Sequence, residues 1–167
     1  LGLGIMGIAD MLNQLGFGYD SERGMEIISD VMEFITNAAY QASASLAAEK
    51  GASPIYSEEE YMECPFFAIA LSDETQSLIR ENGIRNIAIM SIAPTGSISN
   101  IVKGFQLGEK NYIGVSGGVE PIFALYYTRR TESFKENEFY QIFHSTIQAF
   151  IDKMELTKEI ENADKIE

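Results

Sequence analysis

Residues 86–99 read Asn86-Ile87-Ala88-Ile89-Met90-Ser91-Ile92-Ala93-Pro94-Thr95-Gly96-Ser97-Ile98-Ser99. The first half is a continuous apolar run with β-branched residues, which is typical of a strand covered on both faces. A loop of small residues follows, and a short helical pattern then runs from Ile98 to Val102. We therefore predict a buried strand over 84–92 that leads through this loop into a helix start, and such loops recur in α/β folds.

The loop is a candidate site for an anion such as phosphate. The backbone amides of Thr95 to Ile98 can converge on an anion, with the positive end of the helix dipole behind them. Gly96 lets the backbone approach closely, and the hydroxyls of the loop are donors without bulk or charge. The same residues also suit an ordinary turn followed by a serine N-cap, and spacing alone leaves both interpretations open.

A second motif lies downstream and reads Ser116-Gly117-Gly118-Val119-Glu120-Pro121-Ile122-Phe123-Ala124-Leu125-Tyr126-Tyr127-Thr128-Arg129-Arg130. In this order, the two motifs closely resemble the large catalytic subunit of ribonucleotide reductase, in the form of its adenosylcobalamin-dependent class II branch. A third segment, Leu1 to Leu12 with Leu15-Gly16 and Tyr19-Asp20-Ser21, is similar to the helix-turn region that follows the active-site loop of that family. The resemblance covers residues 1 to about 130.

The resemblance implies the fold and the site. It implies that residues 1–167 are a helix-rich fragment of the family's ten-stranded α/β barrel, within one catalytic domain truncated at both ends. The loop residues then match the family's substrate-phosphate site: Pro94, Thr95, Gly96, Ser97, Ile98 and Ser99. Four residues of the second motif match a segment near the substrate: Gly117, Gly118, Glu120 and Pro121. Adenosylcobalamin is the cofactor implied for the full enzyme.

The family's radical cysteine is not in this chain. The finger-loop motif Asn-x-Cys-x-Glu lies upstream of the resembling region, and the single cysteine, Cys64, lacks its flanking Asn and Glu. We interpret Cys64 as a small, partly buried apolar residue. A reducing cysteine pair is also missing from the sequence. We therefore expect no catalytic residue here, no turnover by this chain alone, and either an internal fragment or one half of a split enzyme.

Composition bounds the partners. Twelve basic and twenty-five acidic residues give a net charge of −13, which argues against broad contact with nucleic acid or an anionic membrane. With 167 residues, 46% of them hydrophobic, the chain can hold only part of a ten-stranded barrel. One cysteine and the lack of a membrane-length apolar run in the sequence indicate a reducing cytoplasm.

Periodicity and capping signals predict helices over 5–15, 22–50, 73–82 and 136–154, with a brief one after Ser57 that ends before Pro65. The helix over 22–50 is predicted to be a core helix. Its apolar residues recur at helical spacing: Met25, Ile27, Ile28, Val31, Met32, Phe34, Ile35, Ala38, Ala39, Ala42 and Leu46. We also predict a buried strand over 122–127 and a loop over 103–118.

Three further patterns favour structural interpretations. Gly2-x-Gly4-x-x-Gly7 matches a dinucleotide-binding pattern, but no strand precedes it, so close packing explains these glycines better. His144, the only histidine, lies in the predicted helix over 136–154 without metal-ligand spacing, so no metal site is predicted. Arg129 and Arg130 suit a solvated strand end better than a phosphate contact.

Two functions remain from different classes. The first is a part of a ribonucleoside di- or triphosphate reductase that supplies the substrate-phosphate loop, bound to the rest of the reductase or a partner half, with a homodimer in the full enzyme. The alternative is a non-catalytic nucleotide-binding module derived from that barrel. A glycyl-radical enzyme is disfavoured because the sequence carries no glycyl-radical segment.

Overall fold

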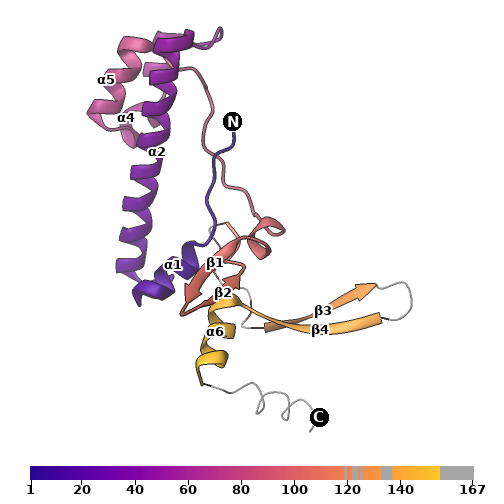
Figure 1. Cartoon of the computed structure of the whole chain (residues 1–167). Coiled ribbons are helices and arrows are strands. Elements are labelled where there is room, and N and C mark those ends of the chain that lie inside the picture. The colour runs from indigo at the N-terminus through magenta and orange to yellow at the C-terminus, as the bar shows by residue number, and fades with distance from the viewer. Residues whose placement is uncertain (119, 122–123, 125, 133–136, 155–167) are drawn as a thin grey trace. The chain divides into compact units, whose positions relative to one another are not determined.

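The computed structural model describes residues 1–118, 120–121, 124, 126–132 and 137–154 (Figure 1). The chain forms two compact units, Leu1–Gly4 with Phe17–Ile92 and Ile5–Gly16 with Ala93–Glu167. We describe each unit by itself. Within the described ranges, no helix is both long enough and apolar enough to span a bilayer.

The first unit is helical. Its elements are α2 (Glu22–Lys50), α3 (Glu58–Met62), α4 (Pro65–Ala70) and α5 (Asp73–Asn82). Serine hydroxyls cap three of the helices: Ser21 accepts from the Gly24 amide, Ser57 from Glu60 and Ser72 from Thr75. Only α4 is unpredicted, because the proline at its first position was interpreted as the end of α3 rather than as a helix start.

The core of this unit lies where α4 and α5 pack along the C-terminal half of α2 (Figure 1). It consists of Tyr40, Ala44, Phe67, Leu71, Ile79, Ile84 and Ile89. The prediction that α2 is a core helix is confirmed in its C-terminal half, where Tyr40 and Ala44 are buried and Ala39 packs against them. It is wrong for the rest of the predicted apolar stripe: none of the eleven stripe residues is fully buried, and Met25 and Phe34 are 58% and 75% exposed. The described part of this unit places no helix along the N-terminal half of α2, so those side chains lack a packing partner there.

The segment 84–92 does not form the predicted strand, and the chain bends at Arg85 and Ile87. The Leu3 amide donates to the Ile89 carbonyl at 2.8 Å, and the Ser91 amide donates to the Leu3 carbonyl at 2.9 Å. These bonds form a single parallel bridge between Leu3 and Met90. A Cβ on Gly4 would lie 2.6 Å from the Ser91 carbonyl oxygen, which confirms close packing at this glycine.

Asn37 joins α2 to the turn between α4 and α5. Its side-chain Oδ1 accepts from the Ser72 amide at 2.8 Å, and its Nδ2 donates to the Glu33 and Ala70 carbonyls at 3.0 and 3.4 Å. Asn37 is 9% exposed, so these bonds are largely shielded from water. The turn holds Ser72, the residue that caps α5, and its position therefore depends on this amide side chain.

The described residues of the second unit form two α-helices, one 3-10 helix and two antiparallel strand pairs. Its elements are α1 (Ile8–Leu15), η1 (Ile98–Asn100), β1 (Lys103–Leu107), β2 (Lys110–Ile113), β3 (Tyr126–Glu132), β4 (Asn137–Phe143) and α6 (Ser145–Met154). Strand β1 pairs antiparallel with β2, and β3 pairs antiparallel with β4 from Tyr126 opposite Phe143 to Glu132 opposite Asn137. The described residues therefore show the helix-rich character that was expected, with two two-stranded sheets, and do not by themselves show a ten-stranded barrel.

Two predictions fail in this unit, and a third is tested only in part. The loop predicted over 103–118 contains the β1–β2 hairpin, in which Gly108 turns the chain at a φ of +61° and the rings of Phe105 and Tyr112 stack at 5.0 Å. The helix predicted over 136–154 begins only at Ser145, because the residues of β4 pair with β3 instead. The strand predicted over 122–127 falls partly on residues outside the description, and β3 starts at Tyr126, which is 53% exposed rather than buried.

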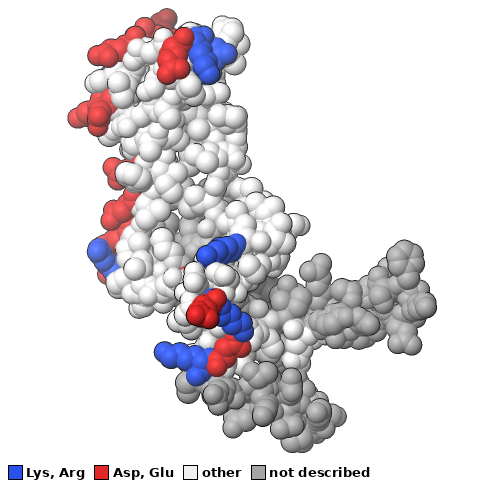
Figure 2. All heavy atoms as spheres, viewed as in Figure 1, with Lys and Arg blue, Asp and Glu red and all other residues white. Residues whose placement is uncertain are grey.

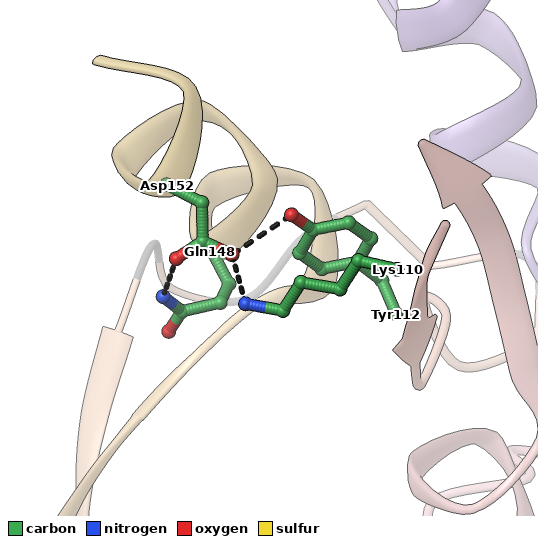
Figure 3. A network of polar contacts seen from close by, with 4 residues as sticks. All are labelled: Lys110, Tyr112, Gln148 and Asp152. Atoms are coloured by element: carbon green, nitrogen blue, oxygen red, sulfur yellow. Dashed lines mark hydrogen bonds and ion pairs between the residues drawn. The ribbon is translucent and has the colours of Figure 1, made fainter. Parts of the chain in front are cut away.

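A polar network ties β2 to α6 (Figure 3). The Asp152 carboxylate accepts from the Lys110 ammonium, from the Tyr112 hydroxyl at 2.8 Å and from the Gln148 amide at 2.9 Å. These hydrogen bonds, that of Lys110 first, lower the pKa of Asp152 to about 2. The carboxylate is thus stabilised in its ionised form by groups from both elements.

Replacing Asn37 by alanine is expected to lower the free energy of unfolding by about 1–2 kcal/mol, because the Ser72 amide and the Ala70 carbonyl lose a largely shielded partner. Urea unfolding followed by helical circular dichroism measures this change. The matched control is Ser77→Ala, at an exposed position of α5, for which we expect a change within about 0.5 kcal/mol. Equal effects of the two substitutions would show that Asn37 does not secure the turn.

Asp152→Asn is expected to destabilise the chain at neutral pH but not in strong acid. Because the folded-state pKa of Asp152 is about 2, below its ordinary value of 3.8, its stabilisation is complete above about pH 5 and disappears as the pH falls towards 2. The difference in urea midpoint between the two proteins should therefore shrink from pH 5 to pH 2. Glu109→Gln in the same hairpin is the control. A pH-independent difference would contradict the network.

Candidate functional site

The candidate phosphate loop lies in the second unit and leads into a single turn of 3-10 helix. That turn, η1, is only Ile98–Asn100, so the predicted helix start is shorter than the sequence pattern indicates. A macrodipole needs several aligned peptide groups, which three residues do not supply. Any anion at this loop must therefore be held by individual amides and hydroxyls rather than by a helix dipole.

Thr95 has an uncommon backbone conformation. Its φ is +49°, the only positive φ at a non-glycine residue among those described. The left-handed region costs an L-residue about 1–2 kcal/mol and is rare for a β-branched side chain. Two hydrogen bonds hold Thr95 there: its Oγ1 accepts from the Gly118 amide at 2.6 Å, and its carbonyl accepts from the Ser99 amide at 3.0 Å.

The two sequence motifs meet at this hydrogen bond. A Cβ on Gly117 would lie 2.9 Å from the Pro94 carbonyl oxygen, and one on Gly118 would lie 2.7 Å from that of Ala93. Gly118 also has a φ of +41°, which side chains rarely tolerate. Both glycines are therefore required where the Ser-Gly-Gly segment crosses the loop. The segment additionally contacts η1, because the Val115 amide donates to the Ser99 carbonyl at 2.8 Å.

The other side of the loop is open. Pro94, Gly96, Ser97 and Ile98 are exposed, and no heavy atom lies within 4 Å of a Cβ built on Gly96. The amides of Ser99 and Asn100 are used within the loop. Within the described structure, by contrast, no hydrogen-bond partner is assigned to the amides of Gly96, Ser97 or Ile98. Three consecutive amides thus remain for an external acceptor.

Not every predicted residue joins this arrangement. Ser99 is 4% exposed, and its hydroxyl oxygen lies 3.9 Å from the position of a Cβ on Gly117, so it lies behind the loop rather than on its open side. Glu120 and Pro121 are exposed, and the Glu120 amide donates to the Gly117 carbonyl at 3.1 Å. The described contacts do not bring these two residues to the loop. The side chains of Arg129 and Arg130 lie outside the described residues.

Asp10 is the polar residue that sequence reasoning missed. It is 5% exposed, its Oδ2 accepts from the Ser116 amide at 2.6 Å, and its Oδ1 accepts from the Thr146 hydroxyl at 3.0 Å. The signal available in the sequence was an acidic residue within the apolar run Ile8 to Leu12. Charged residues are seldom fully buried without partners, so such a residue indicates a buried polar contact. Those partners are more than one hundred residues away in the sequence, so no local pattern identifies them.

His144 and Cys64 differ from their predicted settings. His144 precedes α6 rather than lying in a helix; its Nδ1 accepts from the Thr146 amide at 3.3 Å, and its Nε2 lies 3.4 Å from Asp10 Oδ1. Cys64 is exposed rather than partly buried, because it caps the start of α4. In the described part of the chain, no group of three or more His, Cys, Asp or Glu side chains is arranged to hold a metal ion.

The surface of the first unit is rich in acidic side chains. Figure 2 shows acidic side chains along the edge of that unit where α2 runs. Glu22, Glu26, Asp30 and Glu33 are exposed on this helix and recur about one turn apart. This distribution accounts for part of the net charge of −13, and the candidate loop belongs to the other unit.

Comparisons with known proteins identify relatives of this chain. It is similar to the vitamin B12-dependent ribonucleoside-diphosphate reductase of Mycobacterium tuberculosis (strain CDC 1551 / Oshkosh), with 34% identity over 129 residues, which are 77% of this chain and 15% of that protein. The protein of the same name from Thermoplasma acidophilum is 36% identical over 131 residues, 77% of this chain and 13% of the relative.

A third relative is the ribonucleoside-diphosphate reductase subunit alpha of Chlamydia muridarum, which is 34% identical over 144 residues, 74% of this chain and 13% of that protein. The chain therefore spans only 13–15% of the length of these three relatives. The family model described as "Ribonucleotide reductase, barrel domain" matches residues 1–167. This match over the whole chain confirms the resemblance carried by the two motifs, and the chain belongs to the ribonucleotide reductase barrel-domain family.

Proposed function

We propose that this chain is part of a ribonucleoside-diphosphate reductase and that its loop Pro94–Ser99 holds the phosphates of the substrate. The observation that carries the proposal is that three consecutive amides, Gly96 to Ile98, lack a hydrogen-bond partner within the described structure and belong to exposed residues of a loop braced by Gly118. The names of the relatives support a diphosphate rather than a triphosphate. The match over residues 1–167 supports assigning the whole chain to one partial catalytic barrel domain.

Local amides are the donors that such a site requires in this protein. With a net charge of −13, the chain attracts no anion through its overall field. Hydrogen bonds from N–H groups to an ionised phosphate are short and strong, and backbone donors need no reorganisation when the ligand arrives. The hydroxyl of Ser97, also on the exposed side, adds a further donor. Gly117 and Gly118 act indirectly by bracing Thr95.

The proposed reaction replaces the ribose 2′-hydroxyl by hydrogen. A cysteine thiyl radical takes the 3′-hydrogen, water leaves from C2′, two cysteine thiols supply two electrons and become a disulfide, and the 3′-hydrogen is returned. Neither the radical cysteine nor the pair belongs to this chain, whose one cysteine is Cys64. The contribution of the loop is positional: it fixes the phosphates so that the ribose lies within about 3.5 Å of the reacting sulfur.

Adenosylcobalamin is the cofactor that the names of the relatives support for the full enzyme. When bound, it supplies the radical from which the thiyl is made. The described residues of this chain do not fit it, because its one histidine, His144, accepts from the Thr146 amide through Nδ1 and has its Nε2 buried 3.4 Å from Asp10 Oδ1, where it faces no open site. We therefore assign the cofactor to the rest of the enzyme and no step of its chemistry to this chain.

The remaining partners follow from the same proposal. A chain that spans 13–15% of its relatives would work with the remainder of the large subunit or with a partner half, as a homodimer in the full enzyme and in the cytoplasm. A net charge of −13 favours neither nucleic acid nor an anionic membrane as a partner. A nucleotide-binding module without catalysis is the outcome if the tests below find binding but no turnover.

Gly96→Val, in a reductase whose large subunit carries this chain, is expected to weaken binding of a ribonucleoside diphosphate several-fold or more. The side chain would fill the open space beside the three amides, and no neighbouring atom within 4 Å needs to move to admit it. Equilibrium binding of the nucleotide measures the effect. Gly18→Val is the matched control, since Gly18 is exposed in the first unit and its nearest neighbour, Asp20, lies at an ordinary 3.6 Å. Unchanged affinity for Gly96→Val would remove the loop from the site.

The reading frame that encodes this chain is expected to contain Asn-x-Cys-x-Glu upstream of Leu1. That motif would supply the radical cysteine which the chain lacks, and the reductase activity would then belong to the longer protein. Sequencing the upstream DNA in the same frame tests this. A start codon next to Leu1 would instead require a partner half, and a chain that binds nucleotide but gives no cobalamin-dependent turnover with any such partner would be a binding module.

A further inference from the structure

A buried carboxylate lies directly behind the Ser-Gly-Gly segment. Asp10 is in the first turn of α1 and is 5% exposed. Its Oδ2 accepts from the Ser116 amide at 2.6 Å. The Ser116 carbonyl in turn accepts from the Gly7 amide at 2.9 Å, so both peptide groups of Ser116 are bonded to the start of α1.

The same segment is bonded to the candidate phosphate loop on its other side. The Val115 amide donates to the Ser99 carbonyl at 2.8 Å, and the Gly118 amide donates to Thr95 Oγ1 at 2.6 Å. Ser116 lies between these two residues. A short run of backbone therefore connects Asp10 to Thr95, the residue whose positive φ shapes the loop.

The orientation of the Asp10 carboxylate is set by α6. Its Oδ1 accepts from the Thr146 hydroxyl at 3.0 Å and lies 3.4 Å from His144 Nε2. His144 Nδ1 accepts from the Thr146 amide, and its buried Nε2 makes no hydrogen bond among the described residues, so the Ser116 amide and the Thr146 hydroxyl are the two donors to Asp10. Donors thus face both carboxylate oxygens, and the carboxylate cannot rotate without losing some of them.

We propose that Asp10 is a positioning residue for the substrate phosphates, acting through Ser116 and Gly118 on Thr95. This inference rests on the proposed function of the loop. Burying a carboxylate is costly, and a leucine would suit a helix face that already buries Ile8, Ala9 and Leu12. The presence of a carboxylate at this buried position is explained by the Ser116 amide, which the carboxylate holds in place.

The substitutions distinguish the role of Asp10 as a hydrogen-bond acceptor from the role of its negative charge. Asp10→Asn retains an oxygen for the Ser116 amide, and its NH₂ group can donate to the Thr146 hydroxyl, whereas Asp10→Leu retains similar bulk without an acceptor. Thr146→Val keeps the size of the side chain and removes only the donor that orients Asp10. Met11→Leu on the same helix is the matched control.

In the reductase that carries this chain, Asp10→Leu is expected to raise KM for a ribonucleoside diphosphate about tenfold, the loss of roughly one hydrogen bond, while kcat falls less than about threefold. Asp10→Asn should stay within about threefold of the parent KM, and Thr146→Val should lie between the two. Deuterium exchange of peptides spanning residues 114–118, measured without nucleotide, should accelerate in the same order. The control should change neither quantity.

Unchanged exchange in Asp10→Leu would overturn the inference. If that variant does not fold, unchanged exchange and unchanged KM in Thr146→Val would overturn it equally. Faster exchange with an unchanged KM would also contradict it. In that case the KM of Gly96→Val shows whether only this inference fails or the proposed function of the loop fails as well. A raised KM for Gly96→Val means that this inference alone fails, whereas an unaffected KM for both variants means that the proposed function of the loop fails with it.

Discussion

The hydrogen bond from the Gly118 amide to Thr95 Oγ1 is the contact on which the arrangement of the loop depends. It offsets the left-handed backbone of Thr95, and the residues that follow, Gly96 to Ile98, are exposed with no hydrogen-bond partner for their amides within the described structure. Removing the bond would leave a strained β-branched residue free to return to a commoner conformation. The loop is thus prearranged before any ligand arrives. Its conformation depends on contacts with the segment that contains Gly118, about twenty residues further along the chain.

Prearrangement of this kind constrains residue size more than residue chemistry. Gly117 and Gly118 cross the carbonyl oxygens of Pro94 and Ala93 too closely for any Cβ. Gly96, in contrast, faces open space, so its lack of a side chain is not required by packing. The difference separates two settings of a glycine in one region: Gly117 and Gly118 are needed by the fold, whereas Gly96 leaves the space beside it unfilled.

Local signals predicted most helix boundaries, and long-range pairing caused the errors. Ser21, Ser72 and Gly83 mark helix ends through hydrogen bonds that reach only a few residues, so the sequence contains the whole interaction. Strand β4 was predicted as helix because its pairing with β3 decides its conformation, and no period within 136–154 reports that partner. Asp10 was missed for the same reason. Both motifs of the site were found, but the bond between them required the structure.

The apolar stripe of α2 shows a different limit of sequence reasoning. Its spacing predicts a buried face, yet Met25 and Phe34 are largely exposed in this chain. Spacing specifies which side chains share one face of a helix and not what covers that face. The pattern therefore correctly predicts the helix, but no element of the described first unit packs against the N-terminal half of its apolar face. The candidate loop is less affected, because the contacts that brace it come from Asp10, Ser116 and Gly118 within the chain.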